Sequence, residues 1–137
     1  MHEGLVDDLG RRLDAHADDR TRAWWNRYLK GAIDFRGVPM RGVREAVHAL
    51  WSERGLDERP REEQLDVVLA FFSQRYAEDK LAAILVLGER LVDDLTAADV
   101  PFLAKPFARG HIADWSTCDW YCVKVLARVL ERAPDAP

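Results

Sequence analysis

The sequence predicts an all-α protein, and three observations support this fold class. Apolar residues recur at intervals of three and four along most of the chain, which is the spacing of the buried side of an amphipathic helix. No segment of useful length alternates apolar and polar residues as a half-buried β-strand does. The 137 residues include only 8 Gly and 6 Pro, as expected for helices with few interruptions. We expect one helical domain spanning residues 1–137.

The first three helices are expected from leucine and valine spacing and from residues that begin or end helices. Residues 2–16 carry leucines one turn apart and predict the first helix. Asp18 or Asp19 can cap the second helix, which the segment GAIDFRGVP then interrupts with two glycines and a proline. The third helix begins at Met40, and Gly55 ends it.

The remaining helices are expected after Pro60, across residues 81–91, between Thr96 and Gly110, and from about residue 115 to residue 132. Residues 81–91 are apolar nearly all round, which predicts a helix buried on more than one side at the centre of the fold. Thr96 and Asp99 resemble a capping box. Pro106 is expected to bend the helix that follows them.

About seven helices joined by short loops admit two architectures, a closed bundle or a solenoid of stacked antiparallel pairs. The central apolar helix favours the stack, because an inner helix of a solenoid contacts neighbours on both sides.

The composition restricts the location and partners of the protein. Cys118 and Cys122 lie four residues apart in one expected helix and suggest reduced thiols in a cytosol. No apolar run approaches the length of a membrane span, so we expect a cytoplasmic protein without a membrane partner. The formal net charge of -4 argues against a surface that is basic throughout, although basic residues can gather on one face.

Trp115 and Asp119 are the residues most suited to chemistry, since their spacing of four places them on one helix face. A carboxylate beside an aromatic ring can stabilise a developing cation. Loss of a cationic alkylated purine creates an oxocarbenium-like sugar and needs no general acid. The alternative is that Asp119 caps the helix or pairs with an arginine while Trp115 packs in the core.

Three segments resemble, in order, landmarks of the AlkD-like DNA alkylation repair family. They are WWNRYLKGAIDFRGVPMRGVR, RYAEDKLAAILVL and IADWSTCDWYCVKVL, which begin at Trp24, Arg75 and Ile112. The resemblance implies a HEAT-like α-α superhelix that holds duplex DNA with alkylated bases and excises N3- or N7-alkylpurines. It implies that Asp119 is the catalytic carboxylate and that Trp115 contacts the damaged nucleotide.

The same resemblance places Tyr28 on the DNA-binding face, and Lys30 belongs to its first landmark. Arg41 and Arg44 follow at the start of a helix, where backbone amides and guanidinium groups can hold a phosphate together. A solvated helix face explains these two arginines nearly as well. Family members are longer than this chain, so we expect an N-terminal fragment or a shortened relative. The alternative function is a non-catalytic helical-repeat module that binds DNA or another protein.

Three further expectations concern residues outside this set. No cofactor is expected, and His111 with the two cysteines offers too few ligands for a structural zinc site. The tryptophans at helical spacing, such as Trp24 and Trp51, are expected in the core. A stack that stops at the last helix leaves apolar residues uncovered, so we expect homodimer formation there. These apolar residues are Val123, Leu126, Val129 and Leu130.

Overall fold

The computed structural model describes residues 2–29, 34–112 and 115–132. Within these ranges the regular structure is helical, and the single β-type contact is an isolated bridge between Asp34 and Tyr76. The helices are α1 (Glu3–Asp14), α2 (Asp19–Leu29), α3 (Met40–Glu53), α4 (Arg61–Phe72), α5 (Ala77–Val86), α6 (Val100–Leu103), α7 (Lys105–Ala108), α8 (Trp115–Tyr121) and α9 (Ala127–Arg132). A π-helical segment, Leu87–Leu91, extends α5, and a second one, Cys122–Leu126, joins α8 to α9. Single 3-10 turns occupy Leu56–Glu58, Val92–Asp94 and Ala97–Asp99.

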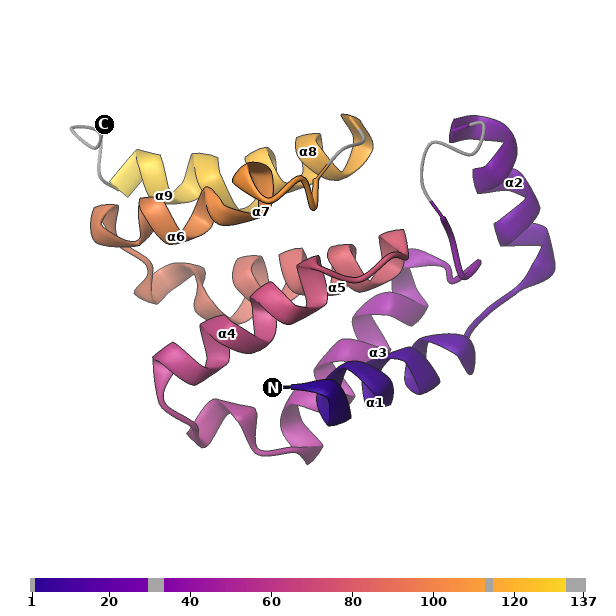
Figure 1. The fold of residues 1–137 in the computed structure, drawn as a ribbon, viewed down its shortest axis with the longest axis horizontal. Coiled ribbons are helices and arrows are strands. Elements are labelled where there is room, and N and C mark those ends of the chain that lie inside the picture. The colour runs from indigo at the N-terminus through magenta and orange to yellow at the C-terminus, as the bar shows by residue number, and fades with distance from the viewer. Residues whose placement is uncertain (1, 30–33, 113–114, 133–137) are drawn as a thin grey trace.

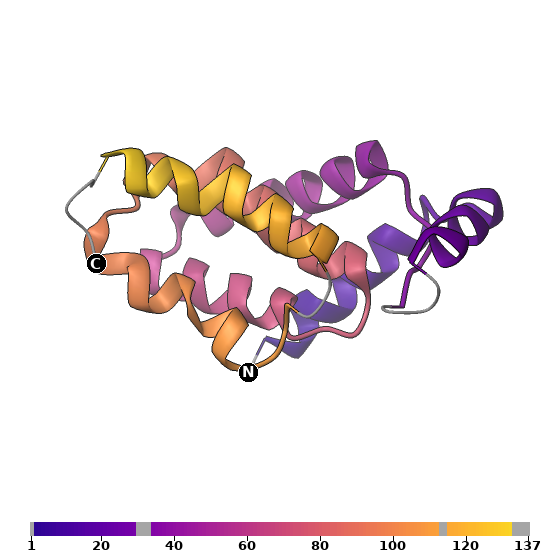
Figure 2. The ribbon, with the colours of Figure 1, turned by 90° about the horizontal axis from the view of Figure 1, so that it is seen from above.

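The helices form two layers (Figures 1 and 2). One layer contains α1, α4 and the pair α6–α7, and the other contains α3, α5 and the long helix built from α8 and α9. Helix α5 lies in the middle of its layer and contacts α3 on one side, α8 on the other, and α4 across the layers. This arrangement confirms the all-α helical-repeat fold that the apolar spacing predicts.

Helix α5 is buried as its composition predicts. Every residue from 82 to 88 is buried, and the buried apolar side chains of the described residues form one cluster that reaches from α1 to α9. Ile84, Val86 and Leu87 have no exposed surface. An inner helix of a stack needs apolar side chains in nearly every direction, which explains why this segment lacks an amphipathic pattern.

The helix expected between Thr96 and Gly110 is divided in two. The Thr96 N–H donates to the Asp99 carboxylate at 2.8 Å, which is half of the expected capping box. The chain then forms α6 and α7, four residues each, with Pro106 at the start of α7. Because proline has no N–H, Pro106 cannot donate to the carbonyl of residue 102 as a continuous helix requires. Gly110, with a φ of 73°, ends α7 as expected.

Two expectations about burial are wrong in part. Trp51 is fully buried, as predicted, and its indole N–H donates to Asp57 at 3.0 Å, but Trp24 is 51% exposed on α2. At the C-terminal end, Val123 is 67% exposed, whereas Val129 is only 1% exposed and packs in the core. The short helices α6 and α7 cover Val129, because they lie against α9 and line an apolar hollow with it.

Candidate functional site

Helix α8 presents Asp119 to solvent, as its packing requires. Thr117 and Tyr121 are 2% and 0% exposed and face the core. The Tyr121 hydroxyl donates to the Leu103 carbonyl at 2.7 Å, and the Tyr121 ring lies 5.1 Å from that of Phe72. Position 119 is about 200° around the helix from position 117, so the Asp119 side chain is exposed.

The Asp119 carboxylate makes no hydrogen bond or ion pair with any residue in the described part of the chain. The structural alternative, in which Asp119 pairs with an arginine, therefore has no support there. Trp115 is the first residue of α8, one turn before Asp119. The Trp115 side chain lies outside what the structure describes, so its predicted contact with a nucleotide stays a prediction.

A close contact between the two π-helical segments holds the α8–α9 helix against α5. The Gly88 carbonyl accepts a hydrogen bond from the Arg128 guanidinium at 3.0 Å. A Cβ at Gly88 would lie 3.3 Å from the Lys124 carbonyl oxygen, which is tighter than ordinary van der Waals contact. Each π-helical segment directly follows an α-helix, Leu87–Leu91 after α5 and Cys122–Leu126 after α8. The α8 backbone that carries Asp119 is thus seated on the central helix by backbone as well as side-chain contacts.

The four residues predicted to bind DNA have different outcomes. Lys30 lies outside the described residues, as does the side chain of Tyr28, whose backbone belongs to α2. Arg41 is exposed in the first turn of α3 and pairs with no described acid. Arg44 is 43% exposed, and its guanidinium pairs with Glu89 of the π-helical segment at 3.1 Å. Arg41 is therefore available to a ligand, whereas Arg44 must first leave Glu89.

Glu89 is the centre of a polar row between α3 and α5. Its carboxylate lies 2.7 Å from His48 Nε2, and Arg90 Nε donates to His48 Nδ1 at 2.8 Å. Partial burial raises the pKa of Glu89, but the hydrogen bonds from Arg44 and His48 outweigh it and hold that pKa below its ordinary value. Along the edge where α3 meets α5, Glu89 thus neutralises Arg44, and Asp57 neutralises Arg90.

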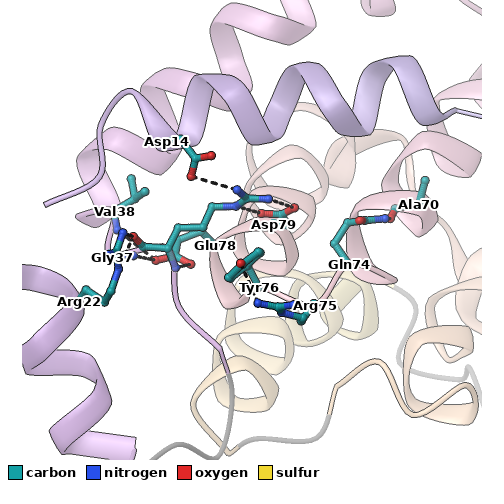
Figure 3. Close-up of polar contacts among 11 residues, drawn as sticks. Asp14, Arg22, Gly37, Val38, Ala70, Gln74, Arg75, Tyr76, Glu78 and Asp79 are labelled. Carbon is teal, nitrogen blue, oxygen red and sulfur yellow. Dashed lines mark hydrogen bonds and ion pairs between the residues drawn. The ribbon is translucent and has the colours of Figure 1, made fainter. Parts of the chain in front are cut away.

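Glu78 clamps the chain that follows α2, a feature that the sequence analysis did not identify (Figure 3). Its side chain is 1% exposed, and its carboxylate accepts the backbone amides of Arg36 at 2.8 Å, Gly37 at 2.9 Å and Val38 at 3.1 Å. Gly37 has a φ of 90°, and a Cβ there would lie 2.6 Å from the Arg22 Cβ. A glycine is needed at this approach between the chain and α2.

Arg36 and Asp79 form a buried ion pair beside this clamp. The guanidinium donates to Asp79 at 2.8 and 3.3 Å and to Asp14 at 3.0 Å, and it lies 4.3 Å from the centre of the Tyr76 ring. Burial raises the pKa of the Asp79 carboxyl above its ordinary value despite the hydrogen bonds from Arg36. Burial alone would lower the pKa of Arg36, but Asp79 and Asp14 raise it. The pair ties together α1, α5 and the segment before α3.

The clamp and the ion pair also hold α2. The Arg22 guanidinium donates to the Arg36 carbonyl at 2.6 and 3.0 Å, and the Asp18 N–H donates to the Gly37 carbonyl at 2.7 Å. The Asp18 carboxylate caps α2 by accepting the Arg20 N–H at 2.9 Å. Helix α2 stands apart from the two layers (Figure 1), and these hydrogen bonds tie its start to the segment that Glu78 clamps. The sequence feature that could have indicated this clamp is the pair of adjacent acids, Glu78 and Asp79, which directly follows the junction between two expected helices.

The positive charges are segregated by ion pairing. Most of the arginines whose side chains the structure describes pair with a carboxylate. Arg20, Arg27 and Arg41 make no ion pair with a described residue, and all three are exposed on α2 or at the start of α3. The same holds for four exposed cations around α7 and on the long helix built from α8 and α9, which are Lys105, Arg109, Lys124 and Arg128. The exposed cations without an ion pair thus lie in two regions of the described chain.

The two cysteines differ in their exposure to solvent. Cys118 is partly buried, whereas Cys122 is exposed, and both are free thiols. Among the described residues, no three or more His, Cys, Asp or Glu side chains gather as metal ligands would. No helix in the same ranges is both long and apolar enough to cross a lipid bilayer.

The stacked helix pairs define the class of the protein, which is an all-α helical-repeat protein. A comparison with protein families matches residues 9–137 to the family described as DNA alkylation repair enzyme. Because this match covers nearly the whole chain, the protein belongs to the DNA alkylation repair family. No curated protein matches the chain in a direct comparison.

Proposed function

We propose that this protein binds duplex DNA and hydrolyses the N-glycosidic bond of cationic N3- or N7-alkylpurines, with Asp119 as the catalytic carboxylate. The observation that carries the proposal is the position of Asp119, exposed and unpaired among the described residues on α8, in a chain of the DNA alkylation repair family. Trp115, one turn earlier, is the proposed positioning aromatic. Tyr28, Lys30, Arg41 and Arg44 are the proposed DNA contacts.

The reaction needs few groups because the lesion activates its own departure. The bond between C1′ and the purine nitrogen breaks, and its electron pair neutralises the positive charge of the alkylated ring. The sugar becomes an oxocarbenium ion, which the Asp119 carboxylate stabilises. A water molecule adds to C1′ and passes a proton to the carboxylate, and the base leaves as a neutral molecule. A carboxylate already engaged by an arginine would serve this step poorly.

Base release from a duplex with a single 7-methylguanine tests the proposal. We expect release by the wild type above the spontaneous rate, and a loss of about 10²–10³-fold in Asp119→Asn. Glu131→Gln removes an exposed carboxylate from the same long helix and is the matched control, with expected wild-type activity. Wild-type release no faster than the spontaneous rate, with binding retained, would instead favour the alternative of a non-catalytic DNA-binding module.

We further propose that the apolar end of the stack mediates a homodimer. Val123 and Leu130 are 67% and 44% exposed, and Leu130 borders the apolar hollow between α9 and the α6–α7 pair. Covering these side chains stabilises a complex by removing apolar surface from water. Sedimentation should show a dimer for the wild type and a monomer for Leu130→Glu. A wild type that stays monomeric at high concentration contradicts this part of the proposal.

A further inference from the structure

Helix α2 carries an exposed stripe of two arginines and one tryptophan. Arg20, Trp24 and Arg27 follow one another at intervals of four and three, so they share one side of the helix. All three side chains are exposed, and Trp24 is 51% exposed despite its size. Arg22, about 200° away around the helix from Arg20, faces the protein and donates to the Arg36 carbonyl. The stripe therefore faces away from the segment that holds α2.

The charge of this stripe is unbalanced. Helix α2 contains three arginines and one aspartate, although the whole chain has a formal net charge of -4. Asp19 pairs with Arg22, whereas Arg20 and Arg27 pair with no acid among the described residues. A cation in the last turn of a helix is stabilised by the negative end of the helix dipole. This explains the position of Arg27, which lies in the last turn of α2, but not that of Arg20. It does not account for a large exposed indole between two arginines.

Helix α2 is tied to the rest of the protein at its base and stands at the end of the stack where α8 begins. Both ribbon views show α8 beginning at the end of the stack that is nearer to α2 (Figures 1 and 2). The Glu78 clamp and the two hydrogen bonds from Arg22 to the Arg36 carbonyl fix the chain at the base of α2 (Figure 3). A DNA duplex is long enough to contact both α2 and α8 at this end of the molecule.

We propose that Arg20, Trp24 and Arg27 form a second DNA contact, which binds the sugar–phosphate backbone of the duplex beside the damaged nucleotide. The two guanidinium groups contact phosphates, and the indole packs against the deoxyribose between them. Positions 20 and 27 are about 10.5 Å apart along the helix axis. Because arginine side chains are long and flexible, the two guanidinium groups can move closer together and reach neighbouring phosphates. This inference rests on the proposed function, because it takes duplex DNA as the ligand.

Binding of a fluorescent, undamaged duplex, measured by anisotropy across a salt series, tests the stripe. Each lost phosphate contact lowers the slope of log affinity against log salt by about 0.9, so Arg20→Gln/Arg27→Gln should lower it by about 2. Trp24→Ala should weaken binding about five- to tenfold with an unchanged slope, because it removes contact area without charge. Arg59→Gln/Arg61→Gln makes the same change in net charge around the start of α4 and should leave the slope unchanged.

The outcomes separate this inference from the proposed function. An unchanged slope in Arg20→Gln/Arg27→Gln, with a wild type that binds, overturns the stripe alone. Equal slopes in the α2 and control variants, both below the wild type, also overturn it, since net charge alone would then explain the loss. A slope lowered by about 2 in Arg20→Gln/Arg27→Gln but not in the control, with no release of 7-methylguanine by the wild type, overturns the glycosylase and leaves the stripe supported. A wild type that does not bind duplex DNA at low salt overturns both.

Discussion

Replacing Glu78 with glutamine tests whether the clamp on the segment after α2 stabilises the fold. The buried carboxylate accepts three backbone amides, one on Oε1 and two on Oε2. A glutamine can keep its oxygen at the Oε2 position, but its NH₂ group then faces the Arg36 N–H. Two donors would oppose each other in a site that is 1% exposed, so Glu78→Gln should destabilise the protein.

The expected cost follows from the bonds that are lost. An unsatisfied buried donor costs about 1–3 kcal/mol, and the two remaining bonds weaken without the negative charge. Removal of that charge also relieves the repulsion that Glu78 exerts on Asp79, which offsets part of the loss. We expect a net loss of about 2 kcal/mol in the free energy of unfolding, equivalent to about 7 °C in Tm for a chain of this length.

Thermal unfolding followed by circular dichroism measures this loss, and hydrogen exchange locates it. The amides of Arg36, Gly37 and Val38 should exchange faster in Glu78→Gln than in the wild type. Asp66→Asn removes an exposed acid from α4 and serves as the control, with an expected change in Tm of about 1 °C or less. A Tm for Glu78→Gln equal to that of the control would refute the reasoning that this carboxylate holds the segment.

Three other changes test the packing and the buried charges. Gly37→Ala should lower the free energy of unfolding by about 2–4 kcal/mol in urea titrations, because φ is 90° and the new Cβ meets the Arg22 Cβ at 2.6 Å. Tyr121→Phe should cost about 1 kcal/mol, since the Leu103 carbonyl loses its hydroxyl donor; an unchanged urea midpoint would contradict this. Burial opposes ionisation of Asp8, but Arg12 and Arg54 hold its pKa below the ordinary value of 3.8. The stability that ionised Asp8 adds is therefore present above that value, and the difference between wild type and Asp8→Asn should vanish as pH falls from about 5 to about 2.

The apolar spacing predicted the helices well because core burial and helix geometry impose the same period. The starts at Met40 and after Pro60, and the ends at Gly55 and Gly110, agree with the structure. Spacing could not predict the break before Pro106, because four-residue helices carry too little pattern to separate from one long helix.

Sequence reasoning singled out Asp119 for a catalytic role, which stays a prediction, but it overlooked the buried acids that hold the segment after α2. Asp119 lies on the exposed side of α8. Glu78 and Asp79 were overlooked because charged residues in the first turn of a helix ordinarily face solvent. Their burial depends on partners some forty residues earlier, the Arg36 side chain and the amides that follow it. No local pattern contains that information.

The acidic net charge and a DNA-binding role are compatible because the structure sorts the arginines into two groups. One group pairs with carboxylates of the stack, some of them buried, as Arg36 does with Asp79 and Arg12 with Asp8. These arginines contribute to the sum of charges without contributing a phosphate contact. Affinity for DNA depends on the cations that remain unpaired. Among the described residues these include Arg20, Arg27 and Arg41 on α2 and at the start of α3, and a second set around α7 and on the long helix of α8 and α9, namely Lys105, Arg109, Lys124 and Arg128. The salt dependence of binding should therefore reflect these cations, and substitutions in the paired arginines should change stability before they change the slope.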